Sequence, residues 1–335
     1  MSGSGGRLNG AINTGIFVLR RLVHVLPTMF LILTVNFFLL QMAPGDAVDV
    51  LTGEAGGASP EIVEMLRKEF GLDQSTGMQF LRYVQNVATF NLGYSVGYNG
   101  HVAPIILERI PASLLLMFTA IVVALIVGVT FGVISAVWRG RWIDNVINVI
   151  SIWGFALPLF WLALMLIVAF SLTLRWFPAS GMYNVYQGHT GWAFVTDVAY
   201  HMVLPVISLS VYYLAIFSRI TRSSMIEIFG QDYMRFAKAK GLHPARITLR
   251  HGLRNALLPI VTITGLQLGA MLGGSVVIET IFAWPGMGRL AFDAIFRRDL
   301  NLLLGILFVS SFLVIIANIL TDMIYSALDP RITLK

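Results

Sequence analysis

Long stretches without charged side chains dominate this chain of 335 residues. Windows free of Asp, Glu, Lys and Arg lie at 22–45, 110–138, 145–174, 198–218, 255–278 and 300–321. Each is long enough for a helix across a hydrocarbon core about 30 Å thick, which takes about 20 residues. Only helices and closed barrels satisfy every backbone polar group in lipid, and continuous apolar runs favour helices. The sequence therefore predicts an all-α polytopic membrane protein with six transmembrane helices.

Composition supports a membrane protein. The chain is 57% hydrophobic and 12% charged, whereas soluble domains carry about 25% charged residues. Two other uncharged stretches, 83–107 and 176–196, are interrupted by Asn, Gly and Pro, so we interpret them as extramembrane loops. Cysteine is absent, so disulfides contribute nothing to the fold.

The distribution of Lys and Arg predicts the orientation, because cytoplasmic loops are enriched in these residues. The richer side includes both chain ends, which we expect to be cytoplasmic. The net charge of +6 is interpreted as a consequence of membrane orientation, not as a nucleic-acid-binding surface. No small-residue cleavage pair follows the first apolar window, so we expect it to remain as an uncleaved helix. The predicted divisions are an N-terminal tail (1–21), a first transmembrane helix (22–45), a periplasmic or extracellular region (46–109), a core with five transmembrane helices (110–328) containing a cytoplasmic loop (219–256), and a C-terminal tail (329–335).

The cytoplasmic loop contains the longest strongly cationic segment, 232–259. A short helix is predicted over 233–240, with Asp232 as its N-cap and Gly241 following its last turn. Its apolar face is expected to comprise Tyr233, Phe236 and Ala237, and its basic flank Arg235, Lys238 and Lys240. Pro244 can open a second helix, on which Arg246, Arg250 and Arg254 recur every four residues. Such a segment can lie on anionic lipid headgroups, but the aromatic face favours docking to a protein.

The segments 232–242 and 250–259 together resemble the EAA loop of ABC-importer permeases. The closest resemblance is to the B-type subunit of the dipeptide, oligopeptide and nickel permease family. The family's Glu-Ala-Ala reads Arg235-Phe236-Ala237 here, while Gly241 is retained. The resemblance covers nearly the whole chain, with further matches at 43–46, 91–95, 221–225, 279–288, 297–299 and 329–331.

This resemblance implies a type I ABC-importer permease fold in a bacterial plasma (inner) membrane. The implied partners are a second permease, two cytosolic ABC ATPases, an extracytoplasmic solute-binding protein and membrane lipid, with no nucleic acid. The resemblance favours a heterodimer of two different permeases. The short helix would be the coupling helix that sits in a groove of one ATPase. The residues implied in that contact are Asp232, Tyr233, Arg235, Phe236, Ala237, Lys238 and Gly241.

The chain is expected to form a pathway and not to catalyse a reaction. It lacks the G-x-x-x-x-G-K-[ST] phosphate loop, so ATP and Mg are expected on the partner ATPases and no cofactor on this chain. Its histidines show no metal-ligand spacing, and no metal site is expected. By analogy with the family the substrates are di- or oligopeptides, with nickel chelates, glutathione or glycosides as alternatives.

Few ionisable residues lie inside the apolar windows, which argues against a gradient-driven secondary transporter. No nucleophile and base cluster there, which argues against an intramembrane hydrolase. The candidate pathway or gate residues are Thr262, Gln267, Glu279 and Trp284. Each has an alternative: an interhelical hydrogen bond for Thr262 and Gln267, a helix-end contact with the turn 284–288 for Glu279, and aromatic anchoring in the membrane interface for Trp284.

Overall fold

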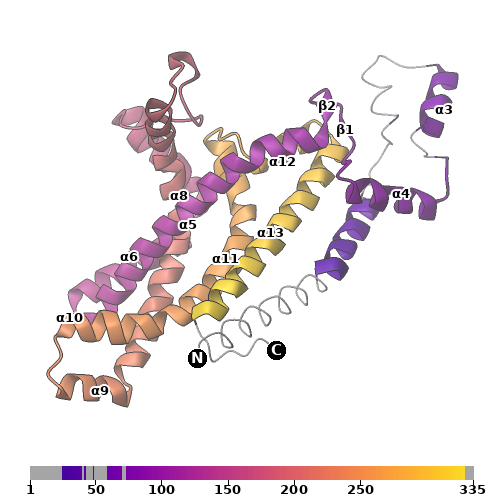
Figure 1. Cartoon of the computed structure of the whole chain (residues 1–335). Helices are drawn as coiled ribbons and strands as arrows, with labels where there is room; N and C mark the ends of the chain where they lie inside the picture. Colours follow the sequence, from indigo (N-terminus) through magenta and orange to yellow (C-terminus); the bar gives the residue numbers. More distant parts are fainter. Residues whose placement is uncertain (1–24, 40, 43–47, 49–58, 70–72, 329–335) are drawn as a thin grey trace. The chain divides into compact units, whose positions relative to one another are not determined.

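The computed structural model describes residues 25–39, 41–42, 48, 59–69 and 73–328 (Figure 1). These residues form two compact units. Unit 1 runs up to Arg109 and also contains Ala291–Ile315, and unit 2 comprises Ile110–Leu290 and the described residues from Ile316 onward. Residues 291–315 thus group with the N-terminal part of the chain and not with the rest of the predicted core.

Unit 1 combines helices with one short hairpin. Strands β1 (Tyr94–Ser95) and β2 (Gly100–His101) pair antiparallel, with Tyr94 opposite His101. The helices that belong to it wholly or in part are Val25–Leu39, α3 (Pro60–Glu69), α4 (Thr76–Ala88), α5 (Val102–Val137), α12 (Met287–Phe296) and α13 (Leu300–Leu328). Ser59 precedes α3 and Pro60 is its first residue, as the sequence predicts for a helix start.

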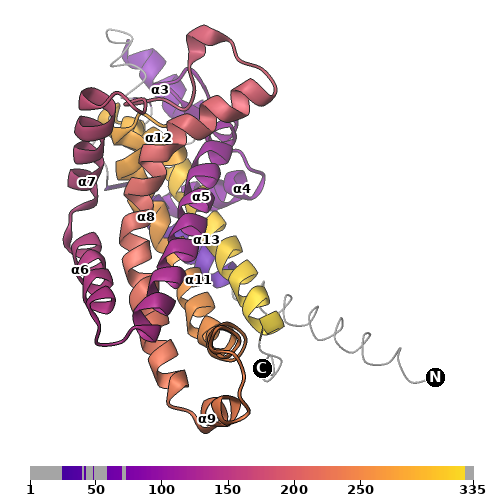
Figure 2. The ribbon, with the colours of Figure 1, turned by 90° about the vertical axis from the view of Figure 1, so that its left-hand side faces the viewer.

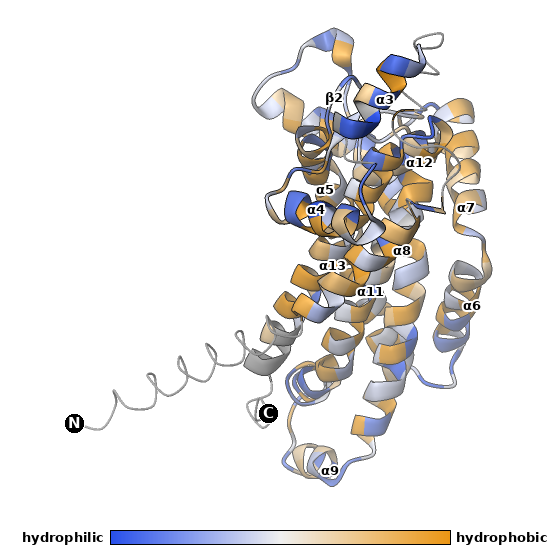
Figure 3. Cartoon of the chain, turned by 90° about the vertical axis from the view of Figure 1, so that its right-hand side faces the viewer, coloured by the Kyte–Doolittle hydropathy of each residue, from blue (hydrophilic) through white to orange (hydrophobic). Residues whose placement is uncertain are grey.

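Unit 2 is built around the long helix α8 (Trp192–Phe229), against which α6, α7 and α11 pack (Figure 2). Its other elements are the rest of α5, α6 (Trp142–Ala156), α7 (Leu159–Leu166), the π-helical segment η1 (Ile167–Thr173), the 3₁₀ turn η2 (Val185–Gln187), α9 (Asp232–Ala239), α10 (Pro244–Arg246), the π-helical segment η3 (Ile247–Leu253) and α11 (Arg254–Ile281). Apolar side chains of α5, α8 and α11 form its core, and hydrophobic residues extend along most of these helices (Figure 3).

The described residues supply three to five membrane spans by length and composition. Val102–Val137, Trp192–Phe229 and Leu300–Thr321 are single helices that meet both criteria. Two bent pairs also meet them, Trp142–Ala156 with Leu159–Thr173 and Pro244–Met271 with Ser275–Ile281. The predicted first span, 22–45, is described only in part, and Val25–Leu39 is a shorter apolar helix. The count of six therefore stays a prediction.

Two of the apolar windows contain prolines that affect the helix differently. The second window, 110–138, coincides with most of α5, which begins at Val102 and continues through Pro111. A membrane helix tolerates the missing N–H when neighbouring helices pack around it. The third predicted span, 145–174, is bent by 105° between α6 and α7. Leu157 before Pro158 is extended, with ψ 130°, because proline disfavours helical geometry in the residue preceding it.

Helices α5 and α8 approach closely at two glycines. A Cβ atom at Gly128 would lie 2.8 Å from the Leu214 carbonyl oxygen, and one at Gly132 would overlap the Thr221 side chain and the Ser218 carbonyl. Small residues at such positions let helix backbones come together in a membrane protein. The C-terminal half of α5 is thereby fixed against α8.

Replacing Gly132 with alanine is expected to lower the free energy of unfolding by about 1–3 kcal/mol, because the new methyl group has no space beside α8. The matched control is Gly77→Ala in α4, where a Cβ atom meets nothing within 4 Å, and where alanine favours the helix. Thermal unfolding of the purified chain in detergent measures both. Equal midpoints for the two variants would contradict the close α5–α8 contact.

Candidate functional site

Helix α9 begins and ends close to the predicted positions. It starts at Asp232, so the N-cap is Gln231 and not Asp232. The Asp232 carboxylate lies in the first turn, where it interacts favourably with the positive end of the helix dipole. It lies 3.6 Å from the Arg235 guanidinium. Gly241 has a φ of +69°, a conformation that glycine adopts without a Cβ clash and that commonly follows a helix end.

The apolar residues of α9 lie on two faces and not on the single one that was predicted. Met234 is fully buried and Ala237 nearly so, packed with Ile247 of η3. Tyr233 and Phe236 are 41% and 69% exposed. The two pairs have the same three-residue spacing but differ by one position, which turns them about 100° apart on a helix. One pair therefore holds α9 against its own chain, and the other faces outward.

Cationic side chains surround the exposed aromatic pair. Arg235 and Lys238 of α9 are exposed, and so are Arg246, Arg250 and Arg254 along the following segment. The Tyr233 hydroxyl accepts a hydrogen bond from Asn255 Nδ2 at 2.9 Å, which links α9 to the start of α11. We call Tyr233, Arg235, Phe236 and Lys238 the α9 surface. An aromatic pair bordered by cations can dock a protein groove that carries acidic groups.

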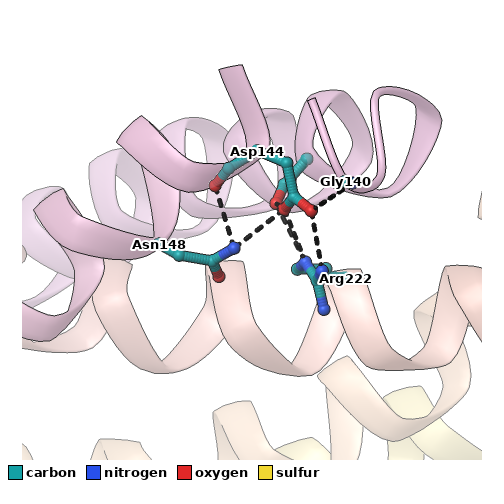
Figure 4. Close-up of polar contacts among 5 residues, drawn as sticks. Gly140, Asp144, Asn148 and Arg222 are labelled. Atoms are coloured by element: carbon teal, nitrogen blue, oxygen red, sulfur yellow. Dashed lines mark hydrogen bonds and ion pairs between the residues drawn. The ribbon is translucent and has the colours of Figure 1, made fainter. Parts of the chain in front are cut away.

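A buried ion pair near this loop was not anticipated from the sequence (Figure 4). The Asp144 side chain is 3% exposed. Arg222 Nε and Nη2 donate to its two carboxylate oxygens, each at 2.8 Å. Further donors are the Ser135 hydroxyl, the Gly140 N–H at 2.9 Å and Asn148 Nδ2 at 2.8 Å. The carboxylate thus joins the end of α5, the α5–α6 turn, the start of α6 and helix α8.

The partners of this pair are 78 residues apart, which is why periodicity did not reveal them. The sequence does carry a signal in their placement, since each lies within a few residues of the end of an apolar window and their charges are opposite. Charges in such positions usually pair with one another.

Glu279 holds the turn that follows α11. It is fully buried, and its carboxylate accepts from the Ser113 hydroxyl at 2.7 Å, the Gly288 N–H at 2.7 Å and the Arg289 N–H at 3.1 Å. The last two donors lie in the first turn of α12, where a carboxylate is favourable. Of the two roles considered for Glu279, this geometry matches the helix-end contact.

Trp284 is also fully buried, and its Nε1 donates to the Ala112 carbonyl at 2.9 Å. The Trp284 side chain therefore has no exposed surface in this structure. Thr262 is exposed, and its hydroxyl donates to Leu258 of its own helix at 3.2 Å, while Gln267 is partly buried. Thr262 and Gln267 remain the accessible pathway candidates. Among the described residues, no three His, Asp or Glu side chains gather in a way that could hold a metal ion.

A second polar network orders unit 1. Buried Asp299 accepts from the Ser95 hydroxyl at 2.5 Å, the Gly97 N–H at 3.2 Å and the Leu302 N–H at 3.1 Å. The Arg297 guanidinium lies 5.1 Å from the centre of the Tyr98 ring. Burial, with the nearby Asp293 charge, raises the pKa of Tyr98. The matched motifs at 91–95 and 297–299 therefore meet in the fold, with the aspartate capping α13.

Replacing Glu279 with glutamine is expected to lower the free energy of unfolding by about 2–4 kcal/mol. The amide group turns a donor toward the Ser113 hydroxyl and the α12 N–H groups and leaves buried donors unpaired. The control is Glu227→Gln on the exposed side of α8. Thermal unfolding in detergent measures the midpoints of both variants. Unfolding of both at the wild-type temperature would contradict this role of Glu279.

Known proteins resemble this chain over most of its length. The family described as "Binding-protein-dependent transport system inner membrane component" matches residues 128–334, and its N-terminal counterpart, "Binding-prot-dependent transport system membrane comp, N-term", matches 15–117. A glutathione transport system permease protein of Escherichia coli is 36% identical over 95% of this chain and 99% of its own length. A putative peptide transport system permease protein of Brucella abortus is 36% identical over 94% and 98%.

The solved structures support the fold. A crystal form of the MetNI methionine ABC transporter in inward-facing conformations has a chain that matches with a TM-score of 0.54 and 18% identity, covering 67% of this chain and 96% of that one. A second crystal form gives a TM-score of 0.55 at 16% identity. The chain therefore belongs to the family of inner membrane components of binding-protein-dependent transport systems, as a multi-pass bacterial inner membrane permease with the ABC-importer permease fold.

Proposed function

We propose that this chain forms the translocation path of a peptide or glutathione importer and is driven by a cytosolic ATPase that binds the α9 surface. The observation that carries the proposal is the exposure of Tyr233 and Phe236 on a helix whose other apolar pair, Met234 and Ala237, is buried against its own chain. The named substrates of the relatives favour peptides and glutathione over nickel chelates and glycosides.

The packing of α9 explains how an eight-residue helix can present such a surface. Isolated helices of this length are unstable in water, so Met234 and Ala237 must supply the stabilising contacts. The structure nevertheless leaves a phenyl ring and a phenol at the surface, and aromatic residues of this kind concentrate the binding energy of protein interfaces. A lipid-binding helix would instead present a continuous apolar stripe to the membrane.

The remaining assignments follow from this arrangement. A second permease would complete the path, a solute-binding protein would deliver the substrate, and two ATPases would bind ATP and Mg, since this chain has no phosphate loop. Thr262 and Gln267 are proposed to line the path. Six spans with both termini in the cytoplasm would place α9 on the ATPase side. Closure of the ATPases would then displace α9 and bias the permease between two states.

Replacing Tyr233 and Phe236 with alanine is expected to leave the chain in the membrane but to reduce the ATPase recovered with it at least about tenfold, as for the loss of interface hot spots. The measurement is purification of the tagged chain in mild detergent with identification of the co-purifying proteins. The matched control replaces Tyr186 and Trp192, two exposed aromatic residues far from α9 in sequence. Recovery of equal amounts of ATPase with both double variants would contradict the assignment.

The substrate class is tested by uptake. Cells lacking this chain are expected to lose uptake of labelled glutathione or of a labelled tripeptide, and the wild-type chain should restore it. Uptake of labelled free leucine serves as the control and should not change. Unchanged uptake of both glutathione and the tripeptide would contradict the proposed substrates.

A further inference from the structure

The end of α8 that leads into α9 contacts several elements of unit 2. Met225 packs with Ala136 of α5 and Ala256 of α11. Ile228 and Phe229 pack against the buried face of α9. One turn earlier, Arg222 binds Asp144 of α6. The last two turns of α8 are therefore tied to α5, α6, α9 and α11.

Helix α6 packs along α8 over a narrow buried face made by Asp144, Ile147, Ser151 and Gly154. The closest apolar contacts lie at its C-terminal end. There the Phe155 ring stacks on Tyr212 of α8, with ring centroids 5.4 Å apart, and a Cβ atom at Gly154 would lie 3.0 Å from Val211. At the N-terminal end of α6, beside the last turns of α8, the Asp144 carboxylate makes the polar contact with α8.

The ion pair fixes the orientation of this N-terminal end of α6 against α8. A guanidinium bound through two nitrogen atoms to both oxygens of a carboxylate has a fixed plane and direction. The Ser135 hydroxyl and the Gly140 N–H bind the same carboxylate, so the α5–α6 turn is held in the same arrangement. Arg222 also donates from Nε to Ser135 Oγ at 3.1 Å. Displacement of the start of α6 relative to α8 would break the bonds that Asp144 accepts from Arg222, Ser135 and Gly140.

We propose that the Asp144–Arg222 pair is the joint that passes displacement of α9 from α8 to the α5–α6 hairpin, so that Asp144 and Arg222 are positioning residues for transport. The inference rests on the proposed function, since it takes α9 to be the element that an ATPase moves. With the joint intact, α6 and the end of α8 move as one rigid body. Without it, the end of α8 moves and the N-terminal end of α6 lags behind.

The test measures one distance in the assembled importer. The chain contains no cysteine, so Val146→Cys near the start of α6 and Glu227→Cys on α8, both exposed, give two spin-label sites. The distance is measured by pulsed electron resonance in lipid nanodiscs, with the solute-binding protein present, before and after adding ATP with vanadate. The backgrounds are wild type, D144N, R222Q, the double variant D144N/R222Q, and the control R219Q, whose arginine is exposed three residues before Arg222.

If the pair acts as this joint, the distance between the two spin labels should stay unchanged on nucleotide addition in wild type and R219Q. The joint predicts a shift of about 2 Å or more, or a clear broadening, on nucleotide addition in D144N, R222Q and the double variant. The double variant separates transmission from stability, because removing both partners leaves no unpaired charge. The thermal unfolding midpoint of the double variant should exceed that of the less stable single variant. The distance between its two spin labels should still change on nucleotide addition.

Three results would overturn the joint: a distance that stays constant in every variant, a distance that changes in wild type, or failure of the variants to assemble, which would make the pair a folding device. Failure of the proposed function looks different, because the wild-type chain would then purify without any ATPase.

Discussion

The hydrocarbon of a bilayer offers no hydrogen-bond partner, so each polar side chain kept inside a membrane protein needs a partner from the protein itself. Two carboxylates of this chain show how strictly this holds. Asp144 is surrounded by four donor groups that include Arg222, and Glu279 by donors from α5 and the start of α12. Both bind segments distant in sequence. These few polar contacts add specific partners to the close apolar packing of the helices.

Unit 2 combines closely packed helices with the exposed α9 surface. Gly128 and Gly132 bring α5 close to α8, and the last turns of α8 pack on α9 through Met234. Because Met234 and Ala237 of α9 pack against Ile228 and Phe229 of α8, a displacement of Phe236 is transmitted to α8. The geometry therefore suits a permease driven by a partner protein.

The sequence predicted what depends on local pattern. Charge-free windows located the long helices, and the proline and glycine positions placed α9 and α10 within about one residue. It did not predict what depends on contacts across the chain. The pairing of Asp144 with Arg222 and the burial of Trp284 both follow from tertiary packing. The sequence identifies the apolar residues of α9, but only the structure shows which of them face outward.

The most direct measurement of the central claim is site-specific photo-crosslinking from position 236 in native membranes, with a photoreactive residue in place of Phe236. The account predicts an adduct with an ATP-hydrolysing cytosolic subunit, and no such adduct from the same probe at position 186. Adducts from position 236 with lipid alone would contradict the account and identify α9 as a helix that binds the membrane surface.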